Sequence, residues 1–231
     1  MTHKLKIGEH TDTGDTYNTV VDSASTGLML DTQSLIDTGH TGDSGLGYFE
    51  ADPMVDKIWA KVDQARLLQY VEDISAFDTR YYTTVGNDNA KEWIQTQLES
   101  FGYTIDTHTF KFKTTTGENV IATKEGNLSE QIIVAAHYDT IAWVDPEVLA
   151  PGANDNGSGV AILLEAARIL SRYDTEHTIK FIFFDIEEQG WIGSTHYAEE
   201  AYANPIHFVY NIDTVGGQAN FQGKQRIVCE E

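Results

Sequence analysis

The chain has 231 residues, of which 41% are hydrophobic and 11% aromatic, enough apolar material for one α/β domain with an extension. There are 36 Asp and Glu residues against 15 Lys and Arg, and the resulting net charge of −21 argues against nucleic acid or anionic membranes as partners. A single cysteine, Cys229, excludes an intramolecular disulfide and a cysteine-rich zinc module.

Residues 1–55 are rich in Thr, Asp, Gly and Ser and lack periodicity, so they are predicted to form a low-order acidic N-terminal extension or the end of a pro-region. The first residues contain no long apolar run, and neither a signal peptide nor a membrane span is predicted. The folded domain is expected over residues 56–231.

The first half of this domain is predicted to hold two helices and a hairpin. One helix is expected over 57–76, where inward positions recur at helical spacing at Val62, Ala65, Leu68, Val71 and Ile74. A second is expected over 87–101 and ends at Gly102. Strands over 103–112 and 119–123 are predicted to pair through a turn near Gly117.

The second half alternates apolar strands with helices. The predicted strands are 131–136, 178–184 and 208–212, and the predicted helices are 159–170 and 191–201. Near-continuous apolar strands are typical of a sheet that is covered on both faces. The pattern therefore predicts an α/β fold with a largely parallel, mixed sheet sandwiched by helices, in which functional groups gather at the carboxyl ends of the strands.

Polar side chains follow each of these three strands. His137-Tyr138-Asp139 follows the first, Asp185-Ile186-Glu187-Glu188 the second and Asp213 the third, while the glycine-rich segment 152–159, which contains Asp155, precedes a helix. Four segments thus bring imidazole or carboxylate groups to one edge of the sheet.

Hard oxygen ligands with one imidazole suit Zn²⁺, or Mn²⁺ or Co²⁺ in its place. Neighbouring residues at a strand end point in different directions, so of two adjacent acids one can bind metal while the other stays free as a base. Each segment alone has a structural alternative: a hydrogen-bonded His–Asp pair, a helix cap or a solvated acidic face. Their order and placement together favour a metal site.

These strings resemble the secreted bacterial leucyl aminopeptidases, di-zinc exopeptidases whose wider family includes glutamate carboxypeptidases and glutaminyl cyclases. The resemblance covers residues 62–231 and includes the segment 77–81 upstream. It implies a zinc-exopeptidase fold of the phosphorylase/hydrolase-like type, hydrolysis of the first bond of peptides with a free N-terminus, and a secreted or extracytoplasmic location.

The resemblance also implies roles for particular residues. Two zinc ions would be held by His137, Asp155, Glu188 and Asp213, with Asp155 bridging them. Glu187 would be the general base, and Asp139 would accept the ring N–H of His137.

One departure concerns the second zinc, because the family takes a further histidine well downstream of the last aspartate. No histidine follows His207 here, and 18 residues follow Asp213. We therefore expect the chain to be truncated at its C-terminus, with an incomplete sheet and substrate pocket, and to be inactive or weakly active alone. A carboxypeptidase or glutaminyl cyclase on the same scaffold, and a non-catalytic peptidase-like domain, stay open as alternatives.

Overall fold

The computed structural model describes residues 53–200 and 205–216. The predicted N-terminal extension, residues 1–55, lies almost entirely outside them. From Ile58 onward the described residues form one compact unit. In this part of the chain, none of the helices has the length and apolar character needed to cross a membrane.

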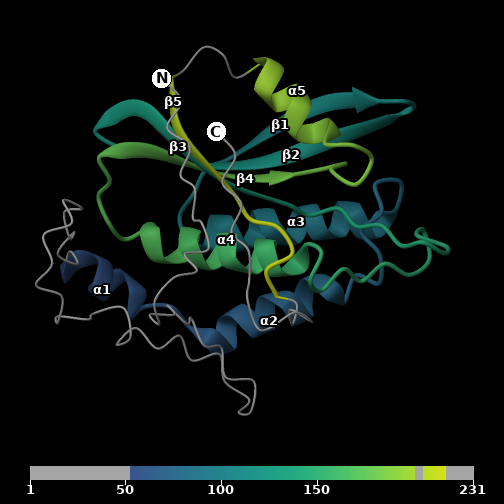
Figure 1. Cartoon of the computed structure of the whole chain (residues 1–231), viewed down its shortest axis with the longest axis horizontal. Coiled ribbons are helices and arrows are strands. Elements are labelled where there is room, and N and C mark those ends of the chain that lie inside the picture. The colour runs from purple at the N-terminus through teal and green to yellow at the C-terminus, as the bar shows by residue number, and fades with distance from the viewer. Residues whose placement is uncertain (1–52, 201–204, 217–231) are drawn as a thin grey trace, which may run out of the picture. The chain divides into compact units, whose positions relative to one another are not determined.

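Five helices and five strands make up the described structure (Figure 1). The helices are α1 (Pro53–Trp59), α2 (Gln64–Ser75), α3 (Val85–Ser100), α4 (Gly157–Leu170) and α5 (Ile192–Glu200). The strands are β1 (Ile105–Phe112), β2 (Thr115–Lys124), β3 (Leu128–His137), β4 (His177–Phe184) and β5 (Ile206–Asn211).

The strands form one mixed sheet in the order β1-β2-β4-β3-β5. β1 pairs with β2, and β2 with β4, in antiparallel fashion, whereas β3 is parallel to both β4 and β5. The predicted mixed α/β fold is confirmed, and parallel pairing is confined to β4-β3-β5. The carboxyl ends of these three strands consequently meet at one edge of the sheet.

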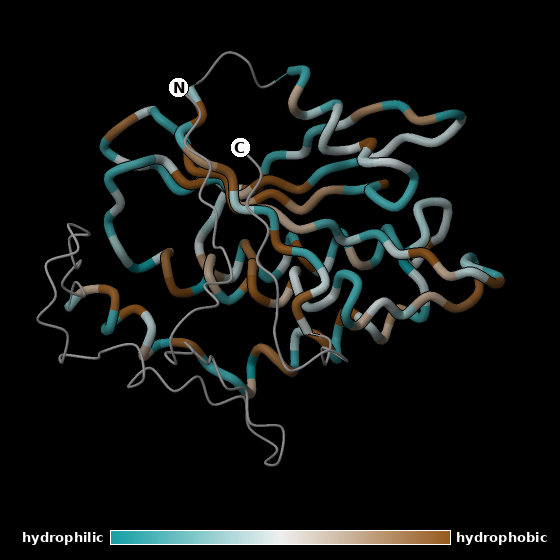
Figure 2. The backbone as a smooth tube through the Cα atoms, viewed as in Figure 1, coloured by the Kyte–Doolittle hydropathy of each residue, from teal (hydrophilic) through white to brown (hydrophobic). Residues whose placement is uncertain are grey.

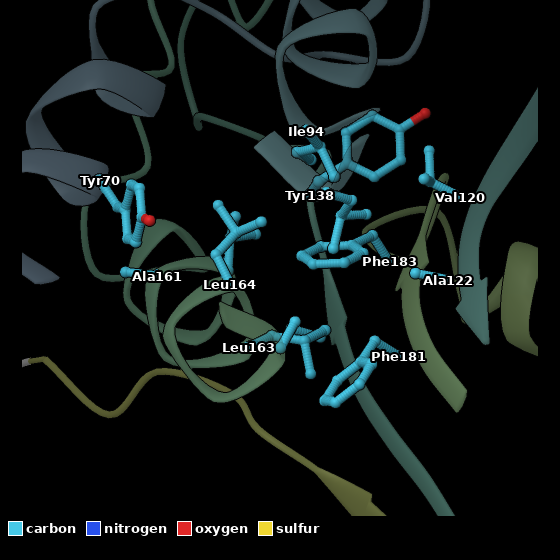
Figure 3. Close-up of a cluster of buried hydrophobic side chains, with 14 of the residues drawn as sticks. Tyr70, Ile94, Val120, Ala122, Tyr138, Ala161, Leu163, Leu164, Phe181 and Phe183 are labelled. Carbon is cyan, nitrogen blue, oxygen red and sulfur yellow. The ribbon is translucent and has the colours of Figure 1, made fainter. Parts of the chain in front are cut away.

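Each face of the sheet is covered by a different set of helices. α2, α3 and α4 lie on one face and α5 on the other (Figure 1). On the first face, Phe181 and Phe183 of β4 are fully buried against Leu163 and Leu164 of α4 (Figure 3). The inner strands β3 and β4 are accordingly rich in apolar residues (Figure 2). This packing fixes the strand ends that carry the polar residues.

The predicted single helix over 57–76 is wrong, because two helices occupy the segment. The side chain of Asp63 accepts a hydrogen bond from Arg66 N and caps α2, which stops α1 from continuing through this point. Of the predicted inward residues Ile74 is buried, whereas Val62 and Leu68 are exposed, and Tyr70 is buried without having been predicted.

The hairpin turn is likewise not at Gly117. Phe112 pairs with Thr115, so the two-residue turn is Lys113-Thr114, and Lys113 has φ 54°. Gly117 lies within β2, where an added Cβ would collide with the ring of Phe110. The glycine is therefore needed for packing between neighbouring strands and not for a turn.

Candidate metal centre

The site lies at the carboxyl ends of the three parallel strands. His137 is the last residue of β3, Asp185 directly follows β4, and Asp213 lies two residues beyond β5. Asp155 comes from the loop before α4. All four segments singled out in the sequence thus reach one place.

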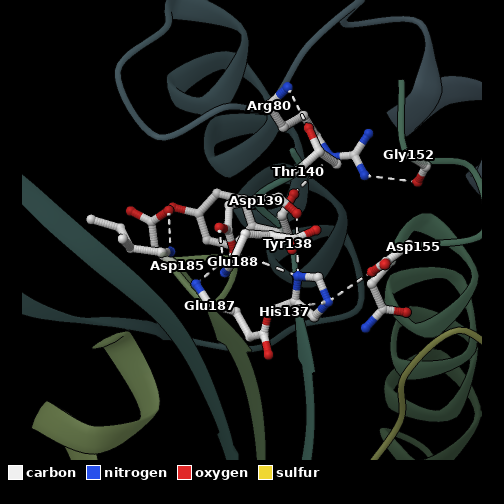
Figure 4. A network of polar contacts seen from close by, with 12 residues as sticks. Arg80, His137, Tyr138, Asp139, Thr140, Gly152, Asp155, Asp185, Glu187 and Glu188 are labelled. Carbon is white, nitrogen blue, oxygen red and sulfur yellow. Dashed lines mark hydrogen bonds and ion pairs between the residues drawn. The ribbon is translucent and has the colours of Figure 1, made fainter. Parts of the chain in front are cut away.

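His137 is the buried centre of this group, with 3% of its side chain exposed. Its Nε2 atom lies 3.2 Å from Oδ1 of Asp155 and 3.4 Å from Oδ1 of Asp213. Oε2 of Glu187 is 3.9 Å from the same nitrogen. One imidazole nitrogen therefore faces three carboxylates from three different loops, and Figure 4 shows two of them, Asp155 and Glu187, beside it.

Glu188 completes the acidic group. Ligand atoms of His137, Asp155 and Glu188 all lie within 4.8 Å of one another, close enough to share an ion. The structure thus brings together all four predicted metal-binding residues and the predicted base. In the described part of the chain, His137 is the only imidazole of the cluster. The individual metal and catalytic roles stay predictions.

Asp139 makes a further contact that the sequence did not indicate. Nδ1 of His137 lies 3.2 Å from the backbone oxygen of Asp139 and 3.5 Å from its carboxylate, so the ring N–H has the carbonyl as its nearer acceptor. The Asp139 carboxylate accepts hydrogen bonds from the backbone N–H of Glu187, at 2.9 Å, and of Glu188, at 3.2 Å. Asp139 therefore positions both glutamates as well as the histidine.

The turn that presents these glutamates is strained. Ile186 is fully buried and has φ 55°, a left-handed conformation that is unfavourable for a β-branched residue. The Asp185 carboxylate accepts from Ile186 N and from Glu118 N, and it also accepts from the side chain of Asn87. These bonds hold the turn in a shape that points Glu187 and Glu188 toward His137.

Arg80 supports the opposite side of the site. It is fully buried, and its guanidinium donates to four backbone carbonyls, of which that of Gly152 is marked in Figure 4. The acceptors are Tyr138 at 2.7 Å, Ile74 at 3.0 Å, Pro151 at 2.7 Å and Gly152 at 3.0 Å. Arg80 thereby ties the segment after His137 to the loop that carries Asp155, where Gly152 has φ 48°.

Asn156 joins the two aspartate loops. Its Nδ2 donates to the backbone oxygen of Ile212 at 2.8 Å, and its Oδ1 accepts from Gly159 N at 2.9 Å and Thr214 N at 3.3 Å. Asn156 is fully buried and also caps α4. It fixes Asp155 and Asp213 relative to each other, because each aspartate is adjacent to a residue of this network.

The electrostatics of the cluster reflect crowded acids around one imidazole. Burial lowers the pKa of His137, but hydrogen bonds to Asp139, Asp155 and Asp213 outweigh it and raise that pKa to about 12. Burial and the Asp155 charge raise the pKa of Glu188 to about 7, and burial also raises the pKa of Glu187. Hydrogen bonding to His137 lowers the pKa of Asp213. Divalent cations would relieve the repulsion among these carboxylates.

The fold and the site define an α/β protein that gathers one imidazole and several carboxylates at the carboxyl ends of its parallel strands. A match to Peptidase family M28 covers residues 119–222 and confirms the predicted resemblance. The matched segment contains all six predicted site residues.

Curated relatives and solved structures agree with this family. Leucine aminopeptidase 1 of Ajellomyces capsulatus (strain NAm1 / WU24) is 32% identical over 151 residues, which is 61% of this chain and 39% of that protein. Leucine aminopeptidase 1 of Sclerotinia sclerotiorum is 33% identical over 146 residues, 58% of this chain and 38% of that protein. The chain thus spans about two fifths of the length of these relatives.

Two similar structures come from Bacteroides thetaiotaomicron. One is a leucine aminopeptidase precursor with TM-score 0.62 and 24% identity, covering 68% of this chain and 64% of that one. The other is a glutaminyl cyclase with TM-score 0.62 and 24% identity, covering 68% of this chain and 63% of that one. At this identity the two structures support the assignment of the zinc-exopeptidase fold to this chain. Both structures have that fold.

Proposed function

We propose that this chain carries the catalytic centre of a zinc aminopeptidase, which hydrolyses the first bond of peptides with a free N-terminus. The observation that carries the proposal is the position of Glu187. Its carboxylate reaches within 3.9 Å of the His137 nitrogen that also faces Asp155 and Asp213, and its side chain is 22% exposed. It is therefore near the place where ions would be held and open to water.

The donor set fits zinc. One imidazole and three carboxylates, from His137, Asp155, Glu188 and Asp213, offer nitrogen and oxygen ligands of the kinds that zinc accepts. We infer that His137, Asp155 and Asp213 hold one zinc, and that Asp155 and Glu188 contribute to a second. Bound zinc would supply a Lewis acid for the scissile carbonyl and lower the pKa of a bound water.

Glu187 would act as the general base. Its carboxylate accepts a proton from the attacking water and then donates it to the amine of the departing peptide. Burial raises the pKa of Glu187, which makes it a better proton acceptor than an exposed glutamate. Asp139 holds the backbone of this residue in place.

The acidic surroundings suit a substrate with a free α-amino group. An ammonium group is attracted by the excess of carboxylates over cations in the site. The curated relatives named leucine aminopeptidase 1 support the same reaction. The proposal includes a secreted or extracytoplasmic location, which cell fractionation would test.

The second candidate is a glutaminyl cyclase, favoured by the similar structure from Bacteroides thetaiotaomicron. Both candidates use a base beside a metal, so the site residues do not separate them. The products do: an aminopeptidase releases a free amino acid, whereas a cyclase converts N-terminal glutamine to pyroglutamate and releases ammonia.

The test is a paired assay of the zinc-loaded protein on a leucyl amide and on a peptide with N-terminal glutamine. We expect weak leucine release from this chain, with Glu187→Gln lowering that rate by about 10²–10⁴-fold while bound zinc is retained. Glu200→Gln is the matched control, because Glu200 is exposed and pairs with His108 away from the site. Cyclisation without release of an amino acid would overturn the aminopeptidase proposal, and normal turnover by Glu187→Gln would overturn the role of the base.

A further inference from the structure

A second group of ligand-type side chains lies at the opposite end of the parallel strands. Glu130 of β3, His177 of β4 and His207 of β5 offer atoms that all lie within 4.8 Å of one another. We call these three residues the amino-end cluster. Figure 1 shows β4, β3 and β5 side by side, and the cluster joins all three.

The contacts within the cluster converge on one oxygen. Oε2 of Glu130 lies 3.4 Å from Nε2 of His177 and 4.0 Å from Nδ1 of His207. The two imidazole rings are stacked, with centroids 4.7 Å apart and an angle of 22° between their planes. Three potential ligand groups from three strands are therefore already gathered.

Irregularities in two strands produce this arrangement. The register between β3 and β4 shifts between Leu128 and Gln131, the stretch that contains Glu130. The register between β3 and β5 shifts between Gln131 and Ile132, where His207 is the additional residue of β5. Bulges re-aim side chains that a regular strand would direct elsewhere, and they are common next to functional sites.

The backbone around the cluster is held in place. The hydroxyl of Thr178 donates to the backbone oxygen of Leu128 at 2.9 Å and accepts from Gly126 N. The backbone N–H of Gln131 donates to the oxygen of Pro205 at 2.9 Å. Glu130 and His177 are each next to a residue held by one of these hydrogen bonds, and His207 lies two residues after Pro205, so little ordering is needed for binding.

The side chains of the amino-end cluster are those of a transition-metal site. Two imidazoles and one carboxylate form a set that binds Zn²⁺ and leaves a fourth position for water. In a tetrahedral site with ligand bonds of about 2.0–2.1 Å, ligand atoms are roughly 3.3 Å apart. The Glu130–His177 distance of 3.4 Å already matches this value, and His207 needs only a small movement.

An ordinary surface ion pair does not account for the cluster as well. The side chains of Glu130 and His207 are 46% and 55% exposed, and pairs at such positions contribute little to stability. A single histidine would satisfy Glu130, yet two bulges bring in a second one. The side chain of His177 is 21% exposed, so a metal ion could reach all three groups from solvent.

We propose that Glu130, His177 and His207 bind a divalent transition-metal ion, with zinc as the preferred occupant, separately from the active site. Glu130 and His137 lie near opposite ends of β3, roughly 20 Å apart at about 3.3 Å per residue. The ion would cross-link the start of β5 to β3 and β4. Its expected role is to stabilise the pairing of β5 with the sheet.

The test measures zinc bound by the full chain at controlled free zinc, with a chelator of known affinity as competitor. His177→Gln and His207→Gln should each lower the zinc affinity of one class of binding sites, on the order of tenfold or more, because each removes a direct ligand. Glu200→Gln is the matched control, since it removes a carboxylate that pairs with one histidine, His108, and should leave binding unchanged. Subtracting the zinc bound by each variant from that bound by the wild type removes the zinc held by the active site and by other histidines.

A second variant guards against simple misfolding. His207→Cys supplies a thiolate, which also binds zinc and cobalt, so it should restore binding relative to His207→Gln. With Co²⁺ it should add a thiolate-to-cobalt charge-transfer absorption beyond that of the wild-type chain, whose spectrum is subtracted to remove any contribution of Cys229. Unchanged zinc affinity and stoichiometry in both glutamine variants would overturn the proposal, as would the absence of the new absorption in a variant that is folded by circular dichroism.

Discussion

Replacing Arg80 is expected to damage both stability and metal binding, although Arg80 is not one of the predicted ligands. Arg80→Met keeps much of the apolar stem but leaves four backbone carbonyls without their donor. The bonds to Tyr138 and Ile74 are buried, whereas those to Pro151 and Gly152 are partly buried and can be replaced by water.

The magnitude follows from these contacts. Hydrogen bonds from a charged donor contribute about 1.5–3 kcal/mol each, and a carbonyl left buried and unsatisfied costs a similar amount. Burial also lowers the pKa of Arg80 to about 10, which shows that the charge itself is costly there, and removing that cost offsets part of the loss. We expect Arg80→Met to lower the unfolding free energy by about 4 kcal/mol.

Urea denaturation measures this loss. Arg80→Lys should lie between the wild type and Arg80→Met, because an ammonium keeps the charge but has fewer donors in a different geometry. Arg172→Met, at an exposed position just after α4, is the matched control and should change stability by no more than about 0.5 kcal/mol. Zinc affinity should fall on the order of 10–100-fold in Arg80→Met, since the loop carrying Asp155 loses its anchor. A loss under about 1 kcal/mol with an unchanged denaturant slope would refute the reasoning.

Changes at Asn156 and Asp139, and a change of pH, are expected to act on the group of side chains around His137. Asn156→Ala should lower the unfolding free energy by about 2–4 kcal/mol and weaken zinc binding, because Ile212 and Thr214 lose their partner; urea titration and zinc competition would show it. Asp139→Asn should reduce turnover by about 10–100-fold with zinc still bound, because a neutral amide has one acceptor oxygen in place of the two carboxylate oxygens that accept from the backbone N–H groups of Glu187 and Glu188. Steady-state rates and metal analysis measure this effect. Without zinc, the unfolding free energy should decrease from pH 5 to pH 8, because His137 and Glu188 have raised pKa values and hold their protons more tightly in the folded state. Zinc must displace these protons, so the zinc affinity should rise over the same pH range. A chelator-treated sample whose stability increased with pH would contradict the assignment.

Much of the site could be predicted from sequence because His137, Glu188 and Asp213 lie at the end of an apolar strand or a few residues after it, and Asp155 lies in a glycine-rich loop before a helix. Strand ends are among the clearest signals in an α/β chain, and parallel neighbours bring those ends to one edge. The pattern of apolar strands alone places His137 and Asp213 at this edge. The strand order and the exact register were not needed.

The residues that hold the ligands in place were not predictable in the same way. Arg80 bonds only to backbone oxygens through its side chain, and backbone carbonyls leave no trace in the sequence. The segment 57–76 shows a related difficulty, because apolar spacing continued past Asp63, and only the capping bond reveals the break. Long-range polar contacts and caps that interrupt a periodic pattern require the folded structure.

The order of the strands has a consequence for how the site forms during folding. β3 pairs with β5, but α4, β4 and α5 all lie between them in the chain. Such a contact closes a long loop and therefore forms late compared with the β1–β2 hairpin. Asp213 joins His137 only once β5 has paired, so a newly made chain has no complete ligand set until its last described strand is in place. Zinc would then stabilise the product of this late step, because any ion that binds both His137 and Asp213 also stabilises the pairing of β5 with β3.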